Sequence, residues 1–207
     1  MKPMLCISLI LNLILIACEI WTFSKLRKKT DIFKYYTYLQ NFLALIVSVA
    51  FSVYLVMAVF GNGAVPEFIK GLRYTVTCGL TATTLIYVVF LSRNKQNIIT
   101  EQDLQPGLPP KTANFLLHYF CPAISLLSFL VFERQIPLEE SLWTGLTAIP
   151  SCLYWVIYLI LSAAKLWKEP YDFTSTNGKK NTFLEVLTMT ALPTSFIAIS
   201  ILLWEIK

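Results

Sequence analysis

Six long apolar stretches limit what this chain can fold into. Each has about the 20 mostly apolar residues that an α-helix needs to cross roughly 30 Å of hydrocarbon. The stretches are residues 4–23, 38–60, 69–91, 113–132, 143–164 and 184–204. Strands of a membrane barrel would be about half as long and would alternate in polarity. The sequence therefore predicts an all-α membrane protein, a bundle of six transmembrane helices.

The composition agrees with a chain that is surrounded mostly by lipid. Of its 207 residues, 56% are hydrophobic and 14% are charged, whereas a soluble domain has about a quarter charged residues. The longest connections, residues 24–37, 92–112 and 165–183, are too short for a soluble domain. We therefore expect one transmembrane domain over residues 1–207, with membrane lipids as partners and no nucleic-acid partner.

The basic residues predict the orientation of the bundle. Twelve of the seventeen Lys and Arg residues lie in the connections that follow the first, third and fifth stretches. The side that is richer in Lys and Arg faces the cytoplasm. We expect an integral protein of the cell membrane, bacterial by the resemblance given below, with both termini outside.

Residues 15–18, LIAC, resemble a bacterial lipoprotein cleavage box, and cleavage there would leave a lipidated Cys18 at the start of the chain. However, the apolar stretch continues to Phe23 and is followed by KLRKK, as in a stop-transfer helix. We interpret the first stretch as an ordinary spanning helix.

The five cysteines all lie in predicted spans and form no C-x-x-C pair. A metal site needs several ligands that converge, which one histidine and scattered thiols do not supply. We interpret the cysteines as small hydrophobic side chains, and we predict no metal site and no cofactor.

The third stretch is rich in small and hydroxyl residues, among them Thr75, Thr77, Gly79, Thr81, Thr83 and Thr84. Such residues let helices approach closely, and threonine can satisfy its hydroxyl on a carbonyl of its own helix. We therefore expect the third helix to be central in the bundle.

Five costly polar or ionisable side chains lie inside the predicted spans, where such groups are candidates for function. They are Asn12, Glu19, Asn41, His118 and Glu185. All but Asn12 fall within roughly 10 Å of the inner interface at a rise of 1.5 Å per residue. Thr37, Tyr87 and Tyr158 lie at comparable depth. The outer halves contain little beyond Asn12 and hydroxyl groups, so the pattern predicts a cavity open to the cytoplasmic leaflet.

His118 is the only histidine of the chain. A neutral imidazole can remove a proton from a hydroxyl, and a threonine needs such a base to act as a nucleophile. Thr37 is the candidate nucleophile. Asn41 would orient a reacting group or donate to a developing oxyanion, and Glu19 would hold the imidazole. We take Tyr87, Tyr158 and Glu185 as further candidate pocket residues.

Structural roles remain open for the same residues. Thr37 would also serve as an N-cap of the second helix, and Asn41 and His118 as hydrogen-bonding residues between helices. Glu19 and Glu185 would reach the interface or pair with lysines. These roles favour a lipid-binding membrane protein without chemistry. In a further alternative, a small transporter or channel, His118 and the threonine-rich third stretch would line a polar path.

Two segments resemble the signatures of a small bacterial family of six-span membrane proteins. They are FKYYTYLQNFLALI, residues 33–46, and NFLLHYFCPAISLLSFLVF, residues 114–132. The family pattern is F-x-Y-F-T-x-x-S-N before the second span, and L-L-H-Y-x-x-P followed by D-W-x-x-F in the fourth. More distantly, both segments resemble the eukaryotic androgen-induced membrane hydrolases, relatives of the androgen-dependent regulator of tissue factor pathway inhibitor. Those six-span proteins hydrolyse esters of fatty acids with hydroxy fatty acids, through an intramembrane Thr and His.

Under this resemblance the matching positions are Thr37, Asn41, His118 and Pro122. The chain departs from the bacterial pattern at Ser128 and Phe129, which replace Asp-Trp, and at Gln40, which replaces a Ser. A conventional triad with an acidic residue ten positions after the histidine is therefore not expected. The resemblance implies an intramembrane hydrolase of fatty-acyl esters that uses Thr37 as nucleophile and His118 as base.

Overall fold

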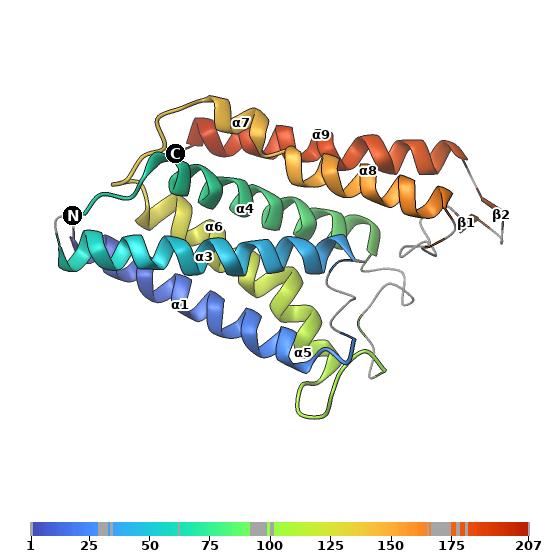
Figure 1. Cartoon of the computed structure of the whole chain (residues 1–207), viewed down its shortest axis with the longest axis horizontal. Coiled ribbons are helices and arrows are strands. Elements are labelled where there is room, and N and C mark those ends of the chain that lie inside the picture. Colours follow the sequence, from blue (N-terminus) through green and yellow to red (C-terminus); the bar gives the residue numbers. More distant parts are fainter. Residues whose placement is uncertain are drawn as a thin grey trace.

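The computed structural model describes residues 2–28, 33, 35–61, 63–91, 99, 102–164, 166, 175–176, 179–180 and 182–206. Within these ranges, the description excludes the side chains of residues 90–91, 162, 175–176, 179–180 and 182–192. Figure 1 shows long helices that run side by side along the longest axis of the molecule. The helix α1 begins and α9 ends at the same end of the bundle, as an even number of spans requires.

The first three spans are nearly regular helices. They are α1 (Lys2–Lys25), α3 (Tyr36–Phe60) and α4 (Glu67–Ile86), and α4 continues into a π-helical turn, η1 (Tyr87–Leu91). α1 runs without interruption through the LIAC segment, residues 15–18. Each helix begins two residues before the apolar stretch that predicted it, at Lys2, Tyr36 and Glu67.

The fourth and fifth spans are less regular. The fourth consists of α5 (Pro110–Phe115), the π-helical turn η3 (Leu116–Phe120), α6 (Cys121–Leu127) and the π-helical turn η4 (Ser128–Phe132). The fifth is divided into α7 (Leu142–Leu146) and α8 (Ile149–Ala163), and the sixth is α9 (Thr182–Ile206). A short antiparallel pair, β1 (Ser175–Thr176) and β2 (Lys179–Lys180), precedes α9.

The predicted fold class is confirmed. Five of the spans are helices long and apolar enough to cross a membrane, and the described part of α9 adds a shorter apolar helix, Pro193–Ile206. Large hydrophobic side chains are exposed on α1, α3 and α8, where lipid is their natural surrounding. The chain is thus a multi-pass α-helical membrane protein.

The helix α4 lies at the centre of the bundle, as its small and hydroxyl residues predict. It packs against α3, α6, α7 and α9 (Figure 1), and 61% of its most apolar window is buried, the largest share of any candidate span. The hydroxyls of Thr77, Thr81 and Thr84 donate to carbonyls one turn back on the same helix at 2.8–2.9 Å. These bonds satisfy the three hydroxyls within the helix, so they do not hinder its close packing.

Two glycines of α4 allow its closest contacts. A Cβ added at Gly71 would lie 2.0 Å from Cε2 of the Trp143 ring. A Cβ added at Gly79 would lie 2.0 Å from the side-chain nitrogen of Gln40. The Gln40 amide is the end of a flexible side chain, but the Trp143 ring is rigid and packs in the core. Gly71 is therefore the less tolerant of the two positions.

We expect Gly71→Ala to lower the free energy of unfolding by about 1–3 kcal/mol, because it overpacks the contact with Trp143. The matched control is Gly145→Ala in α7, where an added Cβ meets nothing within 4 Å. The measurement is unfolding of the purified protein by SDS in mixed micelles. Equal stability of the two variants would contradict the close approach of α4 and α7.

Candidate functional site

The fourth span is irregular at His118 because of the proline that follows. Pro122 is near the start of α6 and has no N–H to donate to the carbonyl four residues back, which is that of His118. The preceding turn is π-helical, and the N–H of Cys121 bonds to the carbonyl of Leu116, five residues back. Single π-helical turns of this kind often occur at functional sites.

The imidazole of His118 is buried inside the bundle, with 5% of the residue exposed. Its ring stacks on the ring of Tyr87, with centroids 3.7 Å apart and planes at 14°. The ring nitrogen Nδ1 has no hydrogen-bond partner among the described residues. Of the candidate pocket residues, Tyr87 is therefore in contact with His118. A buried ring nitrogen without a partner is available to a ligand or a substrate.

Glu19 is completely buried on α1. Neither carboxyl oxygen has a hydrogen-bond partner within the described part of the chain, although the thiol of Cys121 lies beside the carboxyl group. Glu19 is therefore not exposed at the interface, and it pairs with no lysine among the described residues. A buried carboxyl group without a partner is costly, and its presence points to a function.

Thr37 and Asn41 are both buried on the first turns of α3. The N-cap residue of α3 is Tyr35, so the alternative role of Thr37 as the N-cap is wrong. The side-chain nitrogen of Asn41 donates to the Thr37 carbonyl at 2.8 Å, within the same helix. Its oxygen Oδ1 is buried without a partner among the described residues.

Two apolar clusters lie on either side of these polar residues along the length of the helices. The first, here called the loop-side cluster, consists of Phe23, Leu26, Tyr38, Ile99, Leu104, Leu108, Ala113 and Leu117. The second, the mid-bundle cluster, consists of Leu15, Ala44, Val47, Val76, Leu80 and Cys121. Each cluster draws side chains from α1, α3 and the fourth span, which pack against one another. The clusters therefore mark two levels along the same three helices.

On each of these three helices, a buried polar residue with an unpartnered atom among the described residues lies between a member of the loop-side cluster and a member of the mid-bundle cluster. The sets in chain order are Leu15, Glu19 and Phe23 on α1; Tyr38, Asn41 and Ala44 on α3; and Leu117, His118 and Cys121 on the fourth span. We call Glu19, Asn41 and His118 the polar layer. All three are buried, and each has at least one polar atom without a partner among the described residues.

The other candidate residues have different surroundings. Tyr158 lies in a separate apolar cluster, where it packs against the rings of Tyr154 and Trp155. The side chain of Glu185 lies outside the described part of the chain. Thr37 lies one turn from Asn41 on α3, the helix that packs against η3. The polar layer thus includes three of the predicted residues, with Thr37 and Tyr87 next to it.

A second buried polar cluster lies in the other half of the bundle and was not anticipated from the sequence. Arg73 on α4 is 1% exposed, and its guanidinium donates to the Glu133 carboxylate at 3.1 and 3.3 Å. It also donates to the hydroxyl and the carbonyl oxygen of Ser125 at 2.9 and 3.2 Å. The guanidinium carbon lies 5.6 Å from the centroid of the Phe51 ring. Arg73 thereby joins α3, α4 and the fourth span.

The same cluster includes α1. The hydroxyls of Ser128 and Ser8 donate to the Glu133 carboxylate at 2.6 and 3.2 Å. Asn12 donates to the carbonyl of Ser8 at 2.9 Å. We call Arg73, Glu133 and these partners the ion-pair cluster. The expectation that the outer halves contain little beyond Asn12 and hydroxyl groups is therefore wrong.

The sequence offered one indication of this cluster. Arg73 is four residues before Thr77 and eight before Thr81, so it lies on the threonine-rich face of the third helix. Glu133 follows the fourth apolar stretch directly, where it reads as part of a loop. Its burial comes from η4, whose carbonyl at Ser128 accepts from the Glu133 N–H at 3.0 Å and turns the chain inward.

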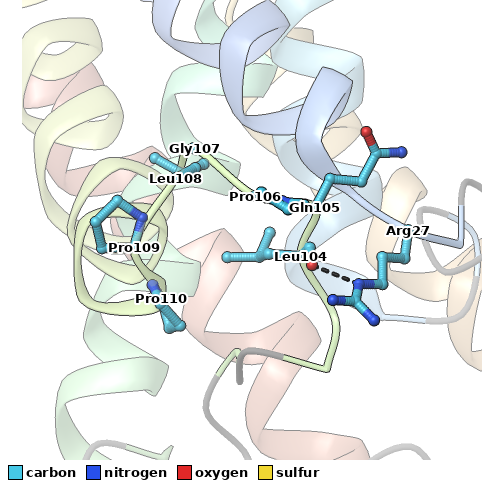
Figure 2. Close-up of a pocket in the computed structure, with 8 residues that line it drawn as sticks. All are labelled: Arg27, Leu104, Gln105, Pro106, Gly107, Leu108, Pro109 and Pro110. Carbon is cyan, nitrogen blue, oxygen red and sulfur yellow. Dashed lines mark hydrogen bonds between the residues drawn. The ribbon is translucent and has the colours of Figure 1, made fainter.

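A pocket of about 550 Å³ lies where residues 104–110 meet the end of α1 (Figure 2). Arg27 donates from Nε to the Leu104 carbonyl at 2.5 Å, and the backbone N–H of Gln105 donates to the Lys25 carbonyl at 2.7 Å. Gly107 has a φ of 102°, which glycine adopts without strain. None of the residues of the polar layer lines this pocket. The hydrogen bonds of Leu104 and Gln105 fasten the loop before α5 to the end of α1.

Comparison of the chain with family models, curated proteins and solved structures finds no match. The interpretation of the site therefore depends on its own geometry.

We expect Arg73→Met to lower the free energy of unfolding by about 3–5 kcal/mol, because it leaves the Glu133 carboxylate buried without its charged partner. Lys70→Met is the matched control, since the Lys70–Glu67 pair lies near the surface and such pairs contribute about 1 kcal/mol or less. Unfolding by SDS in mixed micelles measures both.

The double variant Arg73→Met, Glu133→Leu tests whether the unpaired charge of Glu133 causes the loss of stability in Arg73→Met. It removes both charges, so we expect it to recover part of the stability that Arg73→Met loses. If the double variant is less stable than Arg73→Met, then the buried charge of Glu133 is not the cause of the loss.

Proposed function

We propose that the protein is an intramembrane hydrolase of fatty-acyl esters, with Thr37 as nucleophile and His118 as general base. The observation that supports this most strongly is the buried polar layer, in which Nδ1 of His118, the Glu19 carboxyl and the Asn41 amide oxygen have no partner among the described residues. Ionisable and strongly polar groups at membrane depth are costly, so they are candidates for binding a ligand or for a reaction. The resemblance of residues 33–46 and 114–132 to the Thr/His membrane hydrolases gives the reaction class.

The chemistry follows from the functional groups. Nδ1 of His118 accepts the proton of the Thr37 hydroxyl, and the threonine oxygen attacks the ester carbonyl carbon. The tetrahedral intermediate expels the alcohol, which takes the proton back from the imidazolium. Water then attacks the acyl-threonine with His118 again as base, which releases the fatty acid and restores the hydroxyl.

The remaining groups of the layer position the reacting ones. Stacking on Tyr87 fixes the plane of the imidazole, so its Nδ1 has a defined direction. Asn41 holds the first turn of α3 through its bond to the Thr37 carbonyl. Glu19 supplies a buried acidic group between the same two apolar clusters. The apolar clusters on both sides exclude water and suit an acyl substrate.

Labelling with a fluorophosphonate probe tests the proposal, because the probe forms a bond only to an activated hydroxyl. We expect Thr37→Ala to abolish labelling and His118→Ala to slow it by about 10²–10⁴-fold, the usual contribution of a general base. Thr84→Ala is the control, since that hydroxyl only bonds to the Leu80 carbonyl of its own helix. Undiminished labelling of both Thr37→Ala and His118→Ala would refute the hydrolase.

Proton transport is a second candidate function, and the ion-pair cluster favours it. Buried polar groups occupy both halves of the bundle. The buried face of α1 carries a series of them along its length: Ser8, Asn12, Glu19 and Thr22. A series of such groups across a membrane is typical of proton and ion pathways. The pathway would join the ion-pair cluster to the polar layer.

Vesicles that contain the protein and a trapped pH-sensitive dye test this second function. If the protein conducts protons, an imposed membrane potential changes the internal pH faster than in protein-free vesicles, and Glu19→Gln removes the difference. Thr84→Ala again serves as control. The same rate with and without protein would exclude proton transport and leave the hydrolase untouched.

A further inference from the structure

An apolar groove lies between α3 and α8, on the side of α3 away from the polar layer. Its volume is about 500 Å³, within the range of roughly 300–1,000 Å³ that is usual for small-molecule sites. Leu39 and Leu43 form one wall, and Pro150, Leu153 and Ile157 form the other. The described residues that line the groove present only apolar surface to it.

The back of the groove is rigid. Tyr154 lines it and packs edge-on against Tyr36, with ring centroids 4.9 Å apart. Tyr36 also packs against Phe196 of α9 at 5.8 Å. Both tyrosines are buried, with 4% or less of each exposed. This wall of aromatic rings separates the groove from the interior of the bundle, so the groove opens sideways toward lipid.

The length and depth of the groove match one leaflet of a bilayer. On α8 it extends from Ile149 to Leu161, which corresponds to roughly 18 Å at 1.5 Å per residue. One leaflet contributes about half of the roughly 30 Å hydrocarbon core. On α3 the groove includes Leu39 and Leu43, near the helix start, at the end of the bundle where α8 finishes. The groove therefore lies in the half of the membrane that contains the polar layer.

We propose that this groove binds a single acyl chain of a membrane lipid from that leaflet. An acyl chain is apolar along its length, spans one leaflet and can enter from the side. Ile149, Leu153 and Ile157 are 47–57% exposed at the groove, and a bound chain covers them. Pro150 and the break between α7 and α8 shape the end of the groove at the start of α8, where the acyl chain stops.

Photolabelling with a lipid tests the groove directly. The protein is placed in phosphatidylcholine vesicles that contain some phosphatidylcholine with a diazirine near the middle of one palmitoyl chain. Illumination and peptide mass spectrometry then locate the adducts. We expect label on residues 149–161 and 36–46 at several times the level on α1, where Ile10 and Leu13 are equally exposed to lipid.

Leu153→Trp fills the groove without disturbing the core, since Leu153 is 57% exposed. We expect it to reduce labelling of residues 149–161 several-fold. Ile160→Trp is the matched control, because Ile160 lies on α8 outside the groove and is 62% exposed. Even labelling of all lipid-facing helices, or equal labelling of the two tryptophan variants, would overturn the proposal.

The acyl-chain site does not depend on the proposed hydrolase. His118→Ala is expected to retain the labelling pattern of the groove while it loses reactivity with the fluorophosphonate. A change of pattern in His118→Ala would show that the label reports on the polar layer instead, and that result would also count against a separate site between α3 and α8.

Discussion

The structure depends on the rule that lipid offers no hydrogen bonds, so each polar group inside the bundle must find its partner in the protein. Arg73 and Glu133, at the centre of the ion-pair cluster, satisfy this rule. Arg73 and Glu133 are buried, but the guanidinium and the carboxylate bond to each other and to serines of α1 and the fourth span. Such a cluster fixes the relative position of several helices at once, because a helix that moves leaves a charge without partners.

The polar layer is the opposite case, and this contrast points to its role. Glu19, Asn41 and His118 are as deeply buried as the ion pair, yet atoms of all three are without partners among the described residues. Between the two regions, α1, α3, α4 and the fourth span are held together by apolar packing in the mid-bundle cluster. The bundle therefore has one polar region that stabilises it and another that stays available for a ligand or a substrate.

Local irregularity places the imidazole in this second region. Pro122 cannot complete the helical bond to His118, and the π-helical turn before it changes which residues of the fourth span face inward. His118 then stacks on Tyr87, which lies in the π-helical turn at the end of α4. Two irregular helix segments thus meet at the only histidine of the chain.

Much of this could be predicted from the sequence. The lengths of the apolar stretches predict the spans. Because the rise per residue is constant in a helix, the positions of Glu19, Asn41 and His118 along their spans predict that they lie at one level. Rotation about the helix axis is harder to predict: Tyr158 has the depth of a pocket residue but packs with Tyr154 and Trp155. Arg73 lies near the start of the third apolar stretch and Glu133 directly follows the fourth. Neither is a predicted site residue, because charged residues near span ends usually face water. Only the fold reveals that their charges meet inside.

The most direct test of the account is whether positions 37 and 118 meet across α3 and η3. In a variant without the native cysteines, Thr37→Cys and His118→Cys are treated with a short bifunctional thiol reagent, and the chain is then cut between the third and fourth spans. The account predicts that the two fragments stay joined on a denaturing gel, whereas a control pair of Thr37→Cys with Val131→Cys, at the far end of the fourth span, separates. Separation of the 37–118 pair as well would contradict a site shared by the threonine and the histidine.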